Sequence, residues 1–168
     1  MPETLEFLTL RLRALEDREE IRDLIARYGP LADMGDAPGV AALWREDGVY
    51  AVGGMGESKG SDAIAALIQS PIHRQLMSDG CAHVLSPVSI KVDGDHASAC
   101  GYSCVFRWTG EIWAAVRVSA NRWELVRSNG GWAVLRRDNA LLDGSAAAQL
   151  LFASVKDGHK SGPVLHVA

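Results

Sequence analysis

The fold of this chain is decided by LEDREEIRDLIARYGPLAD, residues 15–33. Its apolar side chains roughly follow helical spacing up to Tyr28, and charged residues fill the opposite side. Gly29-Pro30 predicts a break or a kink before Asp33, because proline removes a backbone donor from a helix. The stretch therefore predicts an amphipathic helix that covers a core and brings a tyrosine and an aspartate to its end.

Helical and strand-like segments follow in separate blocks along the chain. Further helices are predicted at residues 37–44, 61–76 and 146–155. Strands are predicted at residues 49–52, 83–93, 96–108, 111–127 and 131–142. Turn signals such as Asn129-Gly130-Gly131 separate the last four segments, which predicts an antiparallel meander. Helices segregated from strands indicate an α+β fold, in which a strongly curved sheet would leave a cavity beneath the helices.

The length of the chain sets its domain organisation. Its 168 residues are enough for one domain with a substantial core, and we expect that domain to span residues 1–155. The remaining tail, residues 156–168, is polar and contains glycine. It is either disordered or a lid over a pocket.

Composition excludes several classes of function. The chain is 48% hydrophobic and carries a net charge of -4 without a basic block, so neither disorder nor nucleic-acid binding is expected. It has no apolar run of membrane-spanning length and no signal peptide's basic head, so we expect a cytoplasmic protein without membrane contact. Cys81, Cys100 and Cys104 lack disulfide or zinc spacing, and the histidines lack ligand spacing, so no metal is expected.

Three residues carry the chemistry that the sequence predicts. Tyr28 and Asp33 lie near the end of the first helix, and His83 begins the strand-like run HVLSPVSI. A carboxylate orients an imidazole, the imidazole exchanges protons near neutral pH, and a phenol donates a hydrogen bond to a substrate oxygen. Strand alternation places His83 on the face opposite Ile90, unless a bulge at Pro87 resets the pattern.

The strands hold the candidates for substrate contact. Aromatic side chains line apolar ligand pockets and fill cores equally well. The aromatic candidates are Tyr50, Tyr102, Phe106, Trp108, Trp113 and Trp123. Asn121 would need a partner if buried, either a substrate oxygen or a group on a neighbouring strand. Arg137 either enters the pocket and steadies developing negative charge, or joins a solvated face with Asp138.

Four segments together carry a family resemblance. They are LEDREEIRDLIARY at residues 15–28, GSDAI at 60–64, His83 at the start of a strand, and NRWELVR at 121–127 followed by GWAV. The segments resemble SnoaL-like proteins of the nuclear transport factor 2 (NTF2) superfamily over roughly residues 10–152. The resemblance implies a cone in which a curved mixed sheet wraps around a pocket and helices close it.

One branch of that superfamily shares the candidate catalytic pattern. It includes scytalone dehydratase, bile acid 7α-dehydratase and hexachlorocyclohexane dehydrochlorinase, which place an aspartate near the end of the first helix and a histidine at a strand start. Asp33 and His83 match those positions, and Tyr28 and Tyr50 match tyrosines of the dehydratases. The resemblance implies a cofactor-free lyase or isomerase that acts on a small hydrophobic ring compound.

Two non-catalytic interpretations stay open. The chain could be a ligand-binding or partner-docking module, or a scaffold such as the small subunit of aromatic-ring dioxygenases, because a fold does not fix a function. The lyase branch also implies a homo-oligomer, either a trimer or a dimer, assembled through the open face of the sheet.

Overall fold

The computed structural model describes residues 4–153 and 155. The helices are α1 (Leu5–Asp33), α2 (Ala37–Ala41), α3 (Ser61–Ile68), α4 (Pro71–Asp79) and α5 (Ala146–Phe152). The strands are β1 (Trp44–Val52), β2 (Gly56–Lys59), β3 (Cys81–Leu85), β4 (Ser89–Asp93), β5 (His96–Trp108), β6 (Trp113–Ser128) and β7 (Gly131–Leu141). The expected lid, 156–168, lies outside the described residues.

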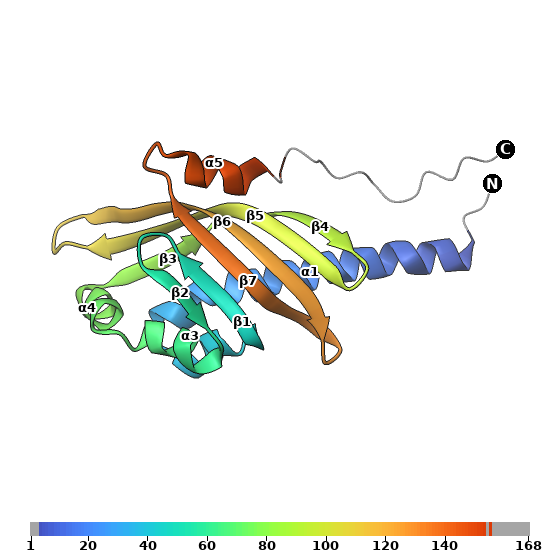
Figure 1. The fold of residues 1–168 in the computed structure, drawn as a ribbon, viewed down its shortest axis with the longest axis horizontal. Coiled ribbons are helices and arrows are strands. Elements are labelled where there is room, and N and C mark those ends of the chain that lie inside the picture. Colours follow the sequence, from blue (N-terminus) through green and yellow to red (C-terminus); the bar gives the residue numbers. More distant parts are fainter. Residues whose placement is uncertain (1–3, 154, 156–168) are drawn as a thin grey trace.

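One mixed sheet organises the domain. Its strand order is β2-β1-β7-β6-β5-β3, with β4 also paired to β5, and only the β1–β7 pairing is parallel. The sheet curves around helices α1 and α3, while α5 lies against its other face (Figure 1). The predicted α+β class and the cone of a curved mixed sheet are confirmed.

Helix α1 does not stop at Gly29-Pro30. It continues unbroken to Asp33, so the predicted break is wrong. Pro30 removes one backbone donor, but Ile21 and Tyr28 are buried against the sheet, and such packing supplies most helical stability in proteins. The first turns of α1 extend beyond the sheet with exposed leucines (Figure 1).

The strand predicted at residues 83–93 divides into β3 and β4. Both pair with β5, but the partners shift by one residue between Leu85, opposite Ser103, and Ser89, opposite Cys100. The extra residue resets the alternation, as the prediction of a bulge at Pro87 requires. His83 and the buried Ile90 therefore belong to the same face of the sheet.

The segment predicted as one helix at residues 61–76 is also divided. Ser70 caps α4 by accepting a hydrogen bond from the backbone of His73, and Pro71 occupies the first turn, where its missing donor is harmless. After the turn between α3 and α4, side chains of α4 face the cavity described below. None of the helices among the described residues has the length and apolar composition needed to cross a membrane.

Candidate active site

A large cavity lies between the curved sheet and helices α3 and α4. It has a volume of about 680 Å³ and is lined by side chains from α1, α3, α4 and five strands. Four residues predicted for the site line it, namely Tyr28, Tyr50, His83 and Arg137. The fold thus brings residues from α1, β1, β3 and β7 to one cavity.

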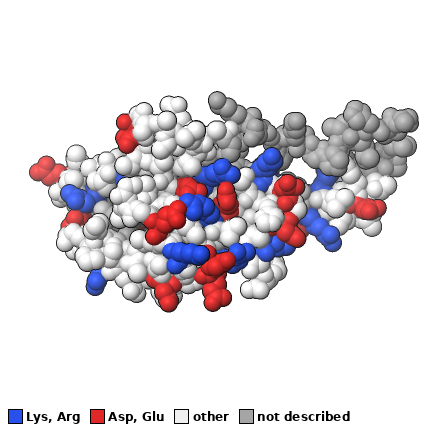
Figure 2. All heavy atoms as spheres, in the orientation of Figure 1, with Lys and Arg blue, Asp and Glu red and all other residues white. Residues whose placement is uncertain are grey.

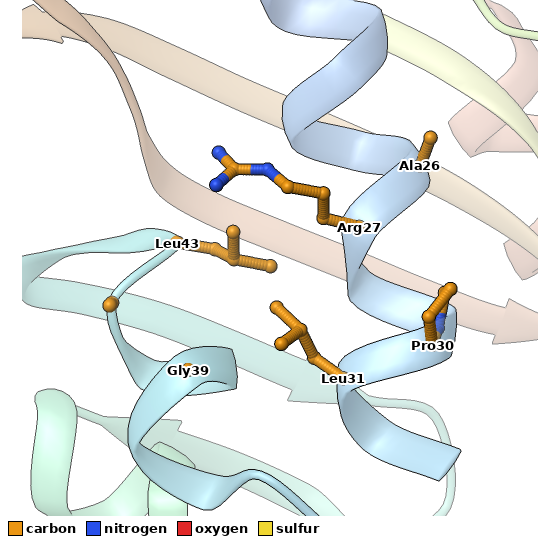
Figure 3. A pocket seen from close by; sticks show the side chains of 7 residues that line it. Ala26, Arg27, Pro30, Leu31, Gly39 and Leu43 are labelled. Atoms are coloured by element: carbon orange, nitrogen blue, oxygen red, sulfur yellow. The ribbon is translucent and has the colours of Figure 1, made fainter. Parts of the chain in front are cut away.

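A second cavity of about 450 Å³ lies between α1 and α2 (Figure 3). Its wall is apolar apart from Arg27, whose side chain extends alongside Leu43 in the view. Arg27 is ion-paired with Asp23 at 3.2 Å. The described residues that line the second cavity include no group able to exchange a proton near neutral pH.

Two hydrogen bonds join His83 to Asp33. Nδ1 of His83 lies 2.6 Å from Oδ1 of Asp33, and the backbone N–H of His83 donates to Oδ2 at 2.9 Å. The imidazole is only 12% exposed. Because Nδ1 is held by the carboxylate, Nε2 is the ring nitrogen left to exchange a proton with a ligand in the cavity.

Hydrogen bonding keeps Asp33 ionised. Partial burial acts to raise the pKa of its carboxyl, but the bonds from His83 and from the Cys81 thiol outweigh burial and hold that pKa below its usual value. Burial and the neighbouring carboxylate raise the pKa of the Cys81 thiol to about 12, so it remains a protonated donor.

The same three side chains have the donor set of a metal site. Their candidate ligand atoms lie within 4.8 Å of one another. Both oxygens of Asp33 already accept hydrogen bonds, Oδ1 from the Cys81 thiol and the His83 ring and Oδ2 from the backbone N–H of His83. The cluster is therefore better suited to orienting His83 than to holding an ion.

Tyr28 stands at the centre of an aromatic cluster. Its ring lies edge-on to the rings of Tyr50, Trp44, Trp123 and His83, with centroids 6.0–6.3 Å apart. The two tyrosine hydroxyls are 3.4 Å apart. Burial, followed by the effect of Tyr50, raises the pKa of the Tyr28 hydroxyl well above its usual value, so this phenol is a hydrogen-bond donor and not a base.

Arg137 enters the cavity instead of joining the solvated face. It is 1% exposed, and its guanidinium carbon lies 4.1–4.6 Å from the ring centroids of Tyr28, Trp123 and Tyr50. Nε and Nη2 donate to Oδ1 of Asn121, whereas Nη1 is buried without a partner. Asn121 and Trp123 do not line the cavity. Asn121 accepts hydrogen bonds from Arg137, and the Trp123 ring packs against its guanidinium.

The remaining predicted contacts do not line the cavity. Tyr102 and Trp113 are each 54% exposed, Trp108 is partly exposed, and Phe106 is half-buried. Tyr102 packs on Phe152 of α5, and Trp108 packs on Trp113. The placement of these four in the pocket was wrong because alternation gives each strand two faces, and the cavity uses the one carrying Ser103 and Val105.

Sequence reasoning missed His73. This α4 residue lines the cavity, and its ring centroid is 5.3 Å from that of His83. Nδ1 lies 3.1 Å from the carbonyl oxygen of Ile68, and Nε2 is buried without a partner. Burial, and then the neighbouring His83, lower the pKa of His73 and favour its neutral form. The contact depends on where α4 crosses the sheet, and no local pattern reveals it.

Comparison with solved structures places this cone in a known class. The chain is 57% identical to an NTF2-like protein with a cystatin-like fold from Novosphingobium aromaticivorans, with a TM-score of 0.87 over 90% of this chain and 98% of that chain. A putative aromatic ring hydroxylase from the same species is 24% identical, with a TM-score of 0.60 over 76% and 90%. A putative calcium/calmodulin-dependent protein kinase II association domain from Xanthomonas campestris is 13% identical, with a TM-score of 0.61 over 75% and 88%.

The fold and cavity define an NTF2-like protein. A model of the SnoaL-like domain matches residues 13–138, so the chain belongs to that family, as its sequence predicts. No curated protein matches the chain.

Proposed function

We propose that this protein is a cofactor-independent lyase or isomerase that moves a proton on a small hydrophobic ring compound. The observation that carries the proposal is the 2.6 Å contact between His83 and an ionised Asp33 on the wall of a largely apolar cavity. A carboxylate at this distance fixes the tautomer of the imidazole and stabilises its charged form.

Each cavity group has a role in such a reaction. His83 abstracts the proton through Nε2, and the gained charge is stabilised by Asp33. Tyr28 or Tyr50 donates to the substrate carbonyl or the departing hydroxyl, which the raised pKa of Tyr28 favours. Arg137 stabilises negative charge that develops on the ring, because it is a buried cation facing the same space.

The non-catalytic alternatives predict a different interior. A scaffold would have a filled core or place His83 outside it, whereas here His83 borders a cavity large enough for a ring compound. The exposed rings on β5 and β6 favour a partner surface, but such a surface is compatible with an enzyme.

The test is elimination or isomerisation of a panel of cyclic ketones and alcohols by the wild type, His83→Ala and Asp33→Asn. A general base contributes about 10²–10⁴-fold, so we expect losses of that order in both variants. Cys100→Ser, on β5 outside the cavity lining, is the matched control. Wild-type rates in both dyad variants would refute the proposal.

A further inference from the structure

The cavity wall contains two arginines without a carboxylate partner. Arg137 bonds only to the amide of Asn121, and Arg117 donates through Nη2 to the backbone oxygen of Gly53 and to Oδ1 of Asn139. Within residues 4–153 and 155, neither guanidinium has a carboxylate within ion-pair distance. Arg107, the third cavity arginine, lies 3.8 Å from Asp79.

The surface of the protein shows the opposite pattern. Basic and acidic side chains alternate on the face seen in Figure 2. Arg136 is ion-paired with Asp138 and Glu57, and Arg127 with Asp17 and Asp95. Arg136 and Arg127 are thus neutralised where water already screens charge, whereas Arg117 and Arg137, which line the cavity, have no carboxylate partner among the described residues.

Neutral amides connect the two unpaired cations. Asn121 and Asn139 face each other across β6 and β7, and Nδ2 of Asn139 donates to Oδ1 of Asn121 at 3.2 Å. Nδ2 of Asn121 donates to the hydroxyl of Ser103 at 2.7 Å. The network therefore orients both guanidiniums without neutralising either.

Position 121 is where a counter-charge would be expected. Its Oδ1 already accepts from both Nε and Nη2 of Arg137, the pair of donors that arginine can also present to the two oxygens of a carboxylate. An aspartate would keep those bonds, and its second oxygen would accept from the Ser103 hydroxyl, which can rotate to donate. The amide leaves the buried charge of Arg137 stabilised by aromatic rings and neutral hydrogen-bond partners alone, without a carboxylate.

We infer that the cavity takes a ring compound bearing a carboxylate, whose anionic group binds between Arg117 and Arg137. The orphaned Nη1 of Arg137 supplies a donor inside the wall, and the half-buried Arg117 supplies a second cation on the adjoining strand. The apolar side chains of α3 and α4 hold the ring. A carboxylate-bearing ring compound would be the substrate class of the proposed function. The inference rests on that proposal only where it identifies the bound acid as the substrate.

Calorimetric titration of the whole protein with benzoate, cinnamate and naphthoate, each against its primary amide, tests the inference. The acids should bind about tenfold tighter than their amides, because charge-assisted hydrogen bonds are roughly twice as strong as neutral ones. Asn121→Asp and Arg117→Gln should reduce that preference to about twofold or less. Arg136→Gln, which removes an ion-paired surface arginine, should retain it.

A second readout needs no ligand. Asn121→Asp should raise the melting temperature, because it places a carboxylate against the buried guanidinium of Arg137. Equal affinity for acids and amides, binding of no acid, or an acid preference that survives both variants would overturn the inference, as would a lower melting temperature in Asn121→Asp. Binding does not require turnover, so the preference persists in His83→Ala even if the proposed chemistry is wrong.

Discussion

Gly29 of α1 lies directly against the backbone of His83 in β3. A Cβ at position 29 would collide with the carbonyl oxygen of His83, so only glycine lets this helix and strand approach closely enough for Asp33 to reach the imidazole. Gly29→Ala should therefore lower the free energy of unfolding by about 1–3 kcal/mol, the usual effect of overpacking. Thermal or urea unfolding measures it. Gly131→Ala, which meets open space, should be near neutral, and equal effects in the two variants would contradict the explanation.

Asp33 should make the protein sensitive to acid. The pKa of Asp33 is lower in the folded state than the ordinary value of 3.8. Ionised Asp33 therefore stabilises the fold above that value, and this stabilisation is lost as pH falls through the folded pKa. We expect Asp33→Asn to lower stability at pH 7 but to flatten the decline between about pH 5 and pH 3. Chemical denaturation across that range provides the measurement. A decline as steep as that of the wild type would show that other carboxylates dominate.

His73 should contribute a second pH dependence, at higher pH. Because the folded pKa of His73 is below the ordinary value of 6.5, neutral His73 stabilises the fold above pH 6.5. This stabilisation is lost as pH falls toward the folded pKa. The groups that face it are His83, which also disfavours its charge, and Asp33, which favours it. Comparing melting temperatures at about pH 7.5 and pH 5.5, we expect His73→Phe to lose less stability than the wild type. His96→Gln, at the exposed start of β5, should match the wild type.

Tyr28 should resist ionisation. Burial raises the pKa of Tyr28 far above the ordinary tyrosine value of 10.0, so its hydroxyl stays protonated at a pH where an ordinary tyrosine titrates. In a spectrophotometric alkaline titration of the folded protein, Tyr28→Phe should leave the phenolate absorbance below pH 11 unchanged. Loss of absorbance in Tyr28→Phe would show that water reaches this hydroxyl.

The outer face of β5 and β6 should hold a second copy of the chain. Trp113 and Val118 are exposed there, and apolar side chains gathered on one face commonly mark a protein interface. We expect native mass spectrometry or light scattering to find a trimer or a dimer. Val118→Glu should shift the protein toward monomers, while Val155→Glu, distant in sequence, should not. A monomeric wild type at micromolar concentration would refute this expectation.

Local patterns predicted most of the elements and few of their boundaries. The turn at Asn129-Gly130 is where the sequence predicts it, because it depends on neighbouring residues alone. Strand β2 was missed, because a short exposed edge strand has no buried face to give it a pattern. The break at Gly29-Pro30 was wrong because tertiary packing outweighed a local preference.

The candidate site was predicted unevenly for a related reason. Tyr28, Tyr50, His83 and Arg137 line the cavity and Asp33 is hydrogen-bonded to His83, while the roles proposed for these residues stay predictions. Four aromatic candidates on β5 and β6 lie elsewhere, since counting residues along a strand does not show which face curves inward. His73, Arg117 and Asn139 carried no signal, because each acquires its significance only from a neighbour on another element.

The sequence by itself determined the amphipathic first helix, the meander and the types of side chain available for proton transfer. These follow from periodicity and turn chemistry, which act over a few residues. Only the tertiary structure decided that Arg137 faces the cavity without a counter-charge and that the imidazole of His73 lies beside that of His83. The physical reason is that sheet curvature, strand register and helix placement are set by packing across the whole domain, and a side chain's electrostatic environment is a property of that packing.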